Sequence, residues 1–239
     1  MSKLQQTFVL SLGGSVFAPE SIRGIDIIYL KKFEKFLRKK ISAGKRFFIV
    51  TGGGYAARDY RDAAVAVMNG RAGKLTQGDL DWLGIHASRL NAHLLRTIFQ
   101  DIAYKRILTD FNNIDKQAAQ YPLVIGAGWK PGCSTDYEAV LIAVDYGFNQ
   151  VINLSDINQV YDKDPNKCKT TKPIKQIKWA DFFKIVGDKW SPGLNVPFDP
   201  VASRLAAEKG IKVIICHGKD FKNLDNILEG KKFIGTVIE

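Results

Sequence analysis

Two glycine turns are the residues of this sequence best suited to do chemistry. The first, at residues 13–15, follows an apolar run at 8–12, and the second, at 52–54, follows an apolar run at 47–51. A turn without Cβ atoms lets an anion approach the backbone N–H groups, and the positive end of a following helix dipole favours that anion. Arg58 lies about one helical turn beyond the second turn, where its guanidinium can bind the same anion. Both turns predict phosphate-binding sites, and the alternative for each is a tight strand-to-helix turn without a ligand.

A third candidate loop covers residues 126–136. It contains three glycines and Pro131, and it ends in Ser134 and Thr135 before a helix predicted at 137–146. Hydroxyl residues commonly cap helix N-termini, so an ordinary capped helix entry is one interpretation. The loop holds more glycine than a cap needs, however, and Lys130 can pair with a phosphate. We therefore predict that this loop binds a ligand.

Asp81 stands near the start of the clearest helical pattern, at residues 79–99, where apolar side chains recur every three or four positions. A carboxylate in the first turn complements the helix dipole by roughly 0.3–1 kcal/mol. An acceptor for ribose hydroxyls is the other interpretation. The sequence alone does not decide between these two interpretations of Asp81.

The elements that must position these residues alternate between strands and helices. Apolar runs predict strands at 8–12, 47–51, 107–108, 122–125, 151–154, 211–216 and 233–238. Helical spacing, caps and breakers predict helices at 27–41, 55–68, 79–99, 137–146, 200–209 and 224–228. This alternation indicates an α/β fold with a mostly parallel central sheet covered on both faces. Ligands of such sheets bind beyond the carboxyl ends of the strands, so the glycine turns can converge on one crevice.

Composition limits the partners. The chain has 239 residues, 46% of them hydrophobic, which suits one large α/β domain or two small lobes, and its formal net charge is +11. Such a charge indicates anionic partners. Many basic residues fall in a short run that predicts the solvated face of a helix, namely Lys31, Lys32, Lys35, Arg38, Lys39 and Lys40. Because aromatic residues do not interleave with a basic stripe, we expect nucleotides as partners and no nucleic acid.

Cysteine usage and hydropathy indicate where such a chain works. Cys133, Cys168 and Cys216 are widely spaced and odd in number, which predicts neither a disulfide framework nor a zinc ribbon. No apolar stretch approaches the roughly 20 residues that a membrane span needs. We expect a cytoplasmic protein with no membrane partner.

Five segments occur in the order found in the amino acid kinase superfamily. They are 10–16 (LSLGGSV), 50–60 (VTGGGYAARDY), 80–91 (LDWLGIHASRLN), 131–136 (PGCSTD) and 160–165 (VYDKDP). Their spacing, and the third segment above all, resembles the archaeal type of UMP kinase. The resemblance covers nearly the whole chain, and five short motifs in order are specific where each alone is weak.

The resemblance implies a fold and a reaction. The fold would be the amino acid kinase fold, an open αβα sandwich forming a single domain over 1–239, with an acceptor lobe over roughly 1–125 and an ATP lobe over 126–239. The reaction would transfer the γ-phosphate of ATP to UMP, giving UDP, with Mg²⁺ accompanying ATP. Members of the family usually assemble as homohexamers.

The resemblance also implies roles for individual residues. The ATP-binding set would be Gly13, Gly14, Ser15, Gly54, Arg58, Ser155, Tyr161 and Asp164. The UMP-binding set would be Gly53, Asp81, Gly128, Trp129, Lys130, Pro131, Gly132, Cys133 and Ser134. Because the phosphate of UMP is already an anionic nucleophile, no general base is needed. The cation that stabilises the transition state stays open between Arg58 and Lys130, and no metal ligand is assigned.

Three positions depart from the family pattern. Ser11 stands where many members carry a lysine, and Asn158 and Gln159 replace an aspartate and a glycine. These departures keep open a non-catalytic relative that binds nucleotides or oxyanions, as molybdenum storage proteins do. A separate alternative is a superfamily kinase with a different acceptor, such as acetylglutamate or isopentenyl phosphate. Kinases of isopentenyl phosphate usually show a histidine near the glycine triplet, and residues 55–59 contain none.

Overall fold

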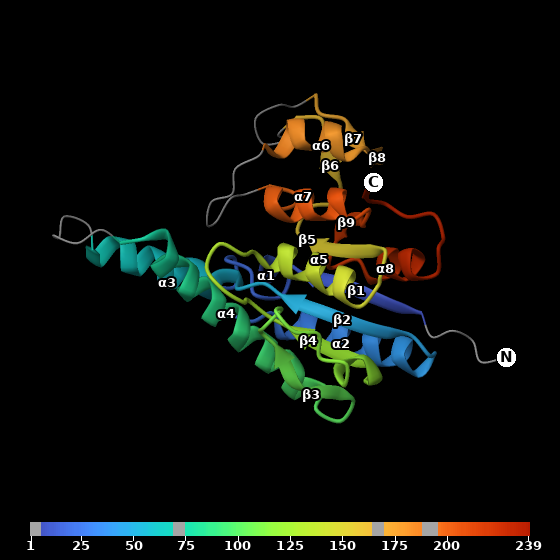
Figure 1. Cartoon of the computed structure of the whole chain (residues 1–239), viewed down its shortest axis with the longest axis horizontal. Helices are drawn as coiled ribbons and strands as arrows, with labels where there is room; N and C mark the ends of the chain where they lie inside the picture. Colours follow the sequence, from blue (N-terminus) through green and yellow to red (C-terminus); the bar gives the residue numbers. More distant parts are fainter. Residues whose placement is uncertain (1–5, 69–74, 164–169, 188–195) are drawn as a thin grey trace.

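The computed structural model describes residues 6–68, 75–163, 170–187 and 196–239. Its centre is an eight-stranded sheet with the order β3-β4-β2-β1-β5-β9-β10-β8 (Figure 1). The strands are β1 Thr7–Leu12, β2 Arg46–Thr51, β3 Ala103–Leu108, β4 Leu123–Gly126, β5 Gln150–Ser155, β8 Gln176–Ile177, β9 Lys212–His217 and β10 Thr236–Ile238. Neighbouring strands are parallel except β9 and β10, which are antiparallel. The predicted mostly parallel sheet is confirmed.

Helices cover both faces of this sheet. The helices are α1 Gly14–Phe17, α2 Ile27–Ser42, α3 Gly54–Met68, α4 Gln77–Ile98, α5 Thr135–Asp145, α6 Trp179–Val186, α7 Pro200–Glu208 and α8 Phe221–Leu228, with a short 3₁₀ turn at Ala118–Gln120. One buried cluster joins the sheet to α1, α2, α4 and α8, and a second joins its other face to α5, α6 and α7. The strands therefore bury both faces, which explains why they read as continuous apolar runs.

The central strand β1 lies between β2 and β5. Leu10 is in register with Ile49 of β2 on one side and with Ile152 of β5 on the other. The chain thus leaves β1 toward β2 and later returns to β1's opposite edge. This reversal of direction creates a crevice at the carboxyl ends of the strands, where α/β proteins bind ligands.

Helix α4 begins two residues before the predicted start, because the capping residue is Thr76. The Thr76 hydroxyl accepts a hydrogen bond from the N–H of Asp79, and the Asp79 carboxylate accepts one from the N–H of Thr76. This reciprocal pair is a capping box. Asp81 consequently lies beyond the first turn of the helix, so the interpretation of Asp81 as a simple partner of the helix dipole loses its basis.

Several short elements were not predicted from the sequence. Helix α6 packs Trp179, Phe182 and Val186 into the core, and two-residue strands form β8 and the separate pair β6 Val160–Tyr161 and β7 Pro173–Ile174. The last strand is half as long as predicted. Elements of two or three residues carry too little periodicity to be recognised in a sequence.

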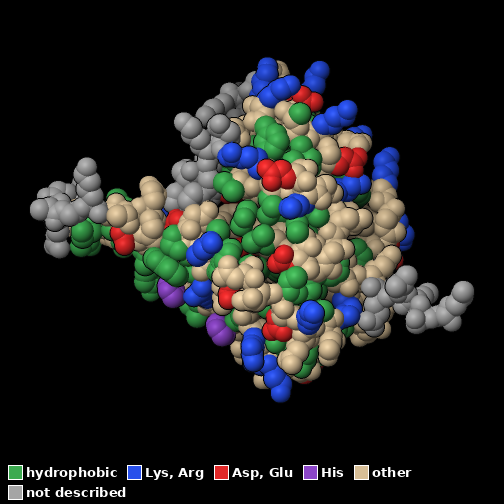
Figure 2. Space-filling view, in the orientation of Figure 1, with side chains coloured by type: hydrophobic (Ala, Val, Ile, Leu, Met, Phe, Trp, Pro, Cys, Tyr) green, Lys and Arg blue, Asp and Glu red, His purple; other side chains and the backbone are tan. Residues whose placement is uncertain are grey.

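The basic run on α2 is only partly solvated. Lys40 is 8% exposed, and its ammonium forms ion pairs with Asp225 and Glu229 near the end of α8. Lys45 joins Glu229 from the following turn. The prediction that the whole run faces solvent is wrong at Lys40, because this side chain ties α2 to α8. On the face in view, Figure 2 shows basic side chains scattered among acidic ones.

Within the described residues, no helix is both long enough and apolar enough to cross a membrane.

Candidate active site

The two glycine turns touch through their backbones. Residues 13–14 follow β1, residues 52–54 follow β2, and the two strands end in register at Leu12 and Thr51. A Cβ atom on Gly14 would lie 2.0 Å from the N atom of Gly54, which itself has a φ of +65°. No side chain fits at such a distance, so glycine is required for the contact. The predicted convergence of these turns is confirmed, whereas the roles of their residues stay predictions.

Asn91 of α4 orients the second turn. Its side-chain amide donates hydrogen bonds to the carbonyl oxygens of Gly52 and Gly53, at 2.8 and 3.1 Å. In a trans peptide the N–H points opposite to the C=O, so the N–H groups of Gly53 and Gly54 point away from Asn91. They lie at the start of the 15-residue helix α3, where N–H groups have no partner inside the helix. The turn is thus arranged to receive an anion.

Arg58 extends from α3 to the junction of the two turns. Its Nη1 lies 3.5 Å from the Ser15 hydroxyl oxygen, and its Nε lies 3.9 Å from a carboxylate oxygen of Glu20. The same Nε is buried without a hydrogen-bond partner. An unsatisfied buried donor costs about 1–3 kcal/mol, and an anion bound between the turns would supply the missing acceptor.

A cavity of about 140 Å³ opens beside the second turn, between α3, α4 and the 126–136 loop. Its lining consists of Gly53, Ala57, Arg61, Leu80, Asp81, Gly84, Ile85, Ser88, Gly128, Cys133, Ser134 and Thr135. The structure thereby brings together Gly53, Asp81, Gly128, Cys133 and Ser134 from the predicted UMP-binding set. Trp129, Lys130, Pro131 and Gly132 are not part of the lining. The ammonium of Lys130 lies 3.9 Å from the centre of the Trp129 ring.

Side chains of α4 hold the loop that closes this cavity. The Ser88 hydroxyl accepts a hydrogen bond from the N–H of Gly128 at 2.8 Å. Arg89 donates to the carbonyl oxygens of Gly128 and Trp129, at 2.9 and 2.8 Å. The Asp81 carboxylate accepts from the N–H of Gly132 at 2.8 Å. Because Asp81 and Ser88 are seven residues apart, they lie on one face of the helix and can hold the loop at two points.

The Asp81 carboxyl is held in a partly buried environment. Burial raises its pKa above the ordinary value, while the Gly132 N–H and the positive charge of Arg61 act in the opposite direction. The N–H bond to Gly132 leaves further lone pairs of the carboxylate available to accept hydrogen bonds. Asp81 can therefore accept from a hydroxyl group in the cavity.

Two buried carboxylates beneath the loop were not assigned from the sequence. Asp136 accepts hydrogen bonds from the Ser11 hydroxyl at 2.8 Å, the Asn153 amide at 3.0 Å and the Asp199 N–H at 3.3 Å, and burial raises its pKa to about 6. Glu138 is fully buried and accepts from the N–H of Trp129, and burial raises its pKa as well. Ser11 therefore has a structural partner, because its hydroxyl links the central strand β1 to Asp136.

Of the remaining predicted ATP-binding residues, Ser155 ends β5 and is in register with His217 at the end of β9. Gly218 donates its N–H to the carbonyl of Ser155, and a Cβ on Gly218 would lie 2.8 Å from Val16 of α1. Ser155 is therefore next to the first glycine turn. Tyr161 lies farther along the chain in β6, paired with Pro173. Asp164 falls outside the residues that the structure describes.

Of the two substituted positions before Tyr161, Gln159 has a structural partner. Its side-chain amide donates to the carbonyl of Gly235 at 3.1 Å, and the next N–H, of Val160, donates to the Thr236 hydroxyl at 2.8 Å. These bonds fasten the segment after β5 to the last strand. A glycine at position 159 could not make the first of them.

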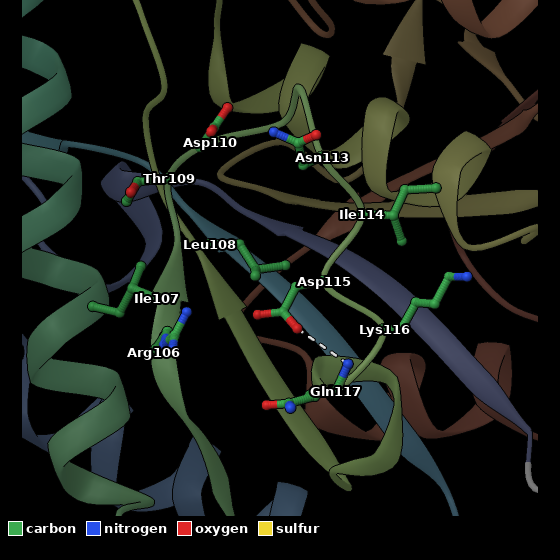
Figure 3. Close-up of a pocket in the computed structure, with 10 residues that line it drawn as sticks. All are labelled: Arg106, Ile107, Leu108, Thr109, Asp110, Asn113, Ile114, Asp115, Lys116 and Gln117. Carbon is green, nitrogen blue, oxygen red and sulfur yellow. Dashed lines mark hydrogen bonds between the residues drawn. The ribbon is translucent and has the colours of Figure 1, made fainter.

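A larger hollow, of about 640 Å³, lies elsewhere, beside the edge strand β3 (Figure 3). Its residues come from the end of β3 and from the loop that follows. Asp115 in this hollow already accepts hydrogen bonds from the Tyr104 hydroxyl at 2.6 Å and the Gln117 N–H at 3.1 Å. The smaller cavity is the better candidate for the substrate site. It adjoins the second glycine turn and the N-terminus of the long helix α3, and Arg61 is part of its lining.

Comparison with known proteins agrees with this geometry. The sequence model of the Amino acid kinase family matches residues 6–217. The chain belongs to the amino acid kinase family. Among curated members, a uridylate kinase of Thermoplasma volcanium is 34% identical, with 99% of both chains covered. A uridylate kinase of Methanospirillum hungatei is 33% identical, covering 97% of this chain and 94% of the relative.

Solved structures of this kinase family support the same assignment. The crystal structure of the uridylate kinase from Archaeoglobus fulgidus is similar to this fold with a TM-score of 0.79 and 29% identity, over 98% of this chain and all of that one. The UMP kinase from Bacillus anthracis, at 18% identity and a TM-score of 0.78, shares the fold. The αβα kinase fold expected from the sequence is confirmed.

Proposed function

We propose that this amino acid kinase transfers the γ-phosphate of ATP to UMP, giving UDP and ADP. The observation that carries the proposal is the backbone contact between two glycine turns beside a cavity that contains Asp81. The relatives that match over nearly the full length are uridylate kinases. In this arrangement the phosphate of UMP lies at Gly53, its ribose lies at Asp81, and the phosphates of ATP lie along the first turn.

The reaction needs positioning more than acid–base chemistry. The phosphate of UMP is itself the nucleophile, so the barrier lies in bringing two polyanions together and stabilising the charge on the transferring group. The N–H groups of Gly53 and Gly54 and the guanidinium of Arg58 point into the gap from fixed positions. Fixed donors of this kind stabilise developing charge without reorganisation. We assign Arg58 as the transition-state cation, because its guanidinium reaches Ser15 of the first turn, whereas the ammonium of Lys130 lies on the Trp129 ring.

Magnesium enters as part of the MgATP substrate. Within the described residues, no group of three or more histidine, cysteine or acidic side chains could hold a metal ion. Mg²⁺ commonly binds through substrate phosphates and keeps several waters, so a dedicated protein cage is not required. We also propose that residues roughly 1–125 form an acceptor lobe and residues 126–239 form an ATP lobe. The 126–136 loop of the ATP lobe then contributes to the lining of the acceptor cavity.

The test is a coupled assay of ADP formation with MgATP and a panel of acceptors, namely UMP, CMP, AMP, acetylglutamate and isopentenyl phosphate. We expect turnover with UMP at the highest kcat/KM. Turnover of another acceptor alone would assign a different kinase of the family. Calorimetric binding of ATP without any product would instead assign a non-catalytic relative, as the substitution at Ser11 allows.

We further propose that the chain assembles with copies of itself, as a homohexamer, in the cytoplasm. An apolar groove of about 360 Å³ lies between α2 and α4, lined by Ile25, Ile27, Leu30, Lys31, Glu34, Leu94 and Ile98. Ile27 and Ile28 are 63% and 69% exposed, which is unusual for isoleucine on a monomer. Among the described residues, Cys133 and Cys216 are free thiols, and a reducing compartment keeps thiols in this form.

Light scattering of the purified protein tests this assembly. We expect a mass near six chains for the wild type and a smaller species for Ile28→Asp. The control is Lys39→Ala, which changes an exposed residue about three helical turns farther along α2. A monomeric wild type at assay concentration would contradict the assembly and leave the kinase proposal in place.

A further inference from the structure

Arg61 is an uncommitted cation in the acceptor cavity. It lies on α3, one helical turn beyond Arg58, and it is half-buried in the cavity lining. Within the part of the chain that the structure describes, its guanidinium makes no hydrogen bond or ion pair, although its charge lowers the pKa of Asp81. Arg89, by contrast, donates to two loop carbonyls. Arg61 therefore has its donors available for a ligand.

The position of Arg61 along the cavity identifies the part of the ligand it meets. Gly53 lies against Gly84 and Ala87 of α4, whereas Arg61 interacts with Asp81, so α3 and α4 run in opposite directions along the two sides of the cavity. Eight residues of helix separate Gly53 from Arg61, which corresponds to about 12 Å at 1.5 Å per residue. Arg61 and Asp81 thus mark the end of the cavity away from the phosphate-binding turn.

We propose that Arg61 determines base specificity by donating hydrogen bonds to O4 of the acceptor's uracil, the carbonyl oxygen that cytosine replaces with an amino group. This inference rests on the proposed function, since it takes the acceptor to be a pyrimidine nucleoside monophosphate. With the phosphate at Gly53 and the ribose hydroxyls at Asp81, the base is the remaining group at the Arg61 end. A guanidinium has donors and no acceptor, so it pairs with a carbonyl oxygen.

The same chemistry discriminates between bases. Uracil presents a carbonyl oxygen where cytosine presents an amino group, which is a donor. Opposite Arg61, cytosine would place two donors against each other and leave both unpaired. A site built to hydrogen-bond one group rejects an analogue that cannot make the bond far better than an apolar pocket does. Arg61 therefore favours UMP over CMP.

The experiment compares the wild type with Arg61→Ala and Arg61→Gln, and uses Lys39→Ala as a control for loss of a surface cation. Steady-state constants are measured for UMP, CMP and ATP. For Arg61→Ala we expect the KM for UMP to rise about tenfold, kcat and the KM for ATP to change less than twofold, and the UMP/CMP ratio of kcat/KM to fall about tenfold. Arg61→Gln offers both a donor and an acceptor, so it should raise kcat/KM for CMP relative to Arg61→Ala.

Two outcomes would overturn the inference. An unchanged KM for UMP in Arg61→Ala would place the side chain away from the ligand. Equal losses for UMP and CMP would assign Arg61 to the phosphate or the ribose. Calorimetric titration of UMP into each folded variant tests the role of Arg61 separately from the proposed function. A wild type that binds UMP without turning it over would refute catalysis alone, and the affinities of the variants for UMP would still test Arg61.

Discussion

The proposed acceptor side and the proposed donor side of the crevice are held together by different kinds of contact. On the acceptor side, polar side chains of α4, namely Asp81, Ser88, Arg89 and Asn91, fix two loops through hydrogen bonds of 2.8–3.1 Å. On the donor side, the first glycine turn, Ser155 and Gly218 meet mainly through backbone atoms at the ends of parallel strands.

This difference indicates how each side can change. A site held by side chains can alter its ligand preference through single polar substitutions. A site held by main-chain atoms tolerates many side chains that point away from it, yet it cannot accept an added Cβ at the contact. We therefore expect polar substitutions to separate acceptor from donor kinetics, and glycine substitutions to affect the whole crevice.

The largest effect should come from Arg58, which lies where the two sides meet. Removal of its guanidinium by Arg58→Ala should lower kcat/KM by about 2–4 kcal/mol, or roughly 30- to 900-fold, because the cation acts on the transferring charge. Steady-state kinetics with both substrates measures this loss. Lys39→Ala controls for a lost surface cation, and a loss below about twofold for Arg58→Ala would place Arg58 outside the site.

An effect of similar size should appear in the free energy of unfolding when the pH is changed. Its source is Asp136, which lies beneath both sides. Burial raises its pKa from 3.8 to about 6, so the folded chain holds a proton that the unfolded chain releases between these values. The free energy of unfolding should consequently fall as the pH rises from about 4 to about 6, by about 3 kcal/mol for two pKa units. Urea denaturation across this range should show a shallower slope for Asp136→Asn. Identical slopes would mean that Asp136 titrates normally.

A smaller loss of stability is expected for Gly14→Ala, which tests the contact between the two sides. The new Cβ would lie 2.0 Å from the N atom of Gly54, and overpacking of this kind costs about 1–3 kcal/mol. The matched control is Gly78→Ala, where the nearest atom would be 3.7 Å away. Urea denaturation should show a lower midpoint only for the first variant. Equal midpoints would mean that the turns can move apart freely.

The smallest effect should be confined to the acceptor side. Asp81→Asn keeps an acceptor for the Gly132 N–H but loses the charge, so the hydrogen bond to a ribose hydroxyl should weaken by about 1 kcal/mol. The KM for UMP should rise about fivefold while the KM for ATP stays unchanged. An equal rise in both constants would place Asp81 away from the acceptor.

The strands, the long helices and the glycine turns could be predicted because local sequence encodes them. Apolar runs, helical spacing and bare turns are local patterns, and the parallel arrangement of the sheet then brings the turns to one edge. Asp81 and the 126–136 loop were also singled out, and Gly132 N–H bonds to Asp81 in the structure.

The polar connections between these elements could not be predicted in the same way. Helical spacing indicates which face carries Ser88, Arg89 and Asn91, but the loop residues that they bind are 38 to 40 positions away in the chain. Asp136 and Glu138 follow Ser134 in an ordinary capped helix, so the sequence gives no sign of their burial. Arg61 resembles any surface arginine until the opposite helix is in place.

The contact between the glycine turns also limits how far the carboxyl ends of β1 and β2 can move apart. Main-chain atoms that touch can separate only if β1 and β2 separate, and the paired register from Thr7 and Arg46 to Leu12 and Thr51 holds these strands together. In the proposed reaction, the spacing between the outgoing and receiving phosphates is therefore set by the sheet.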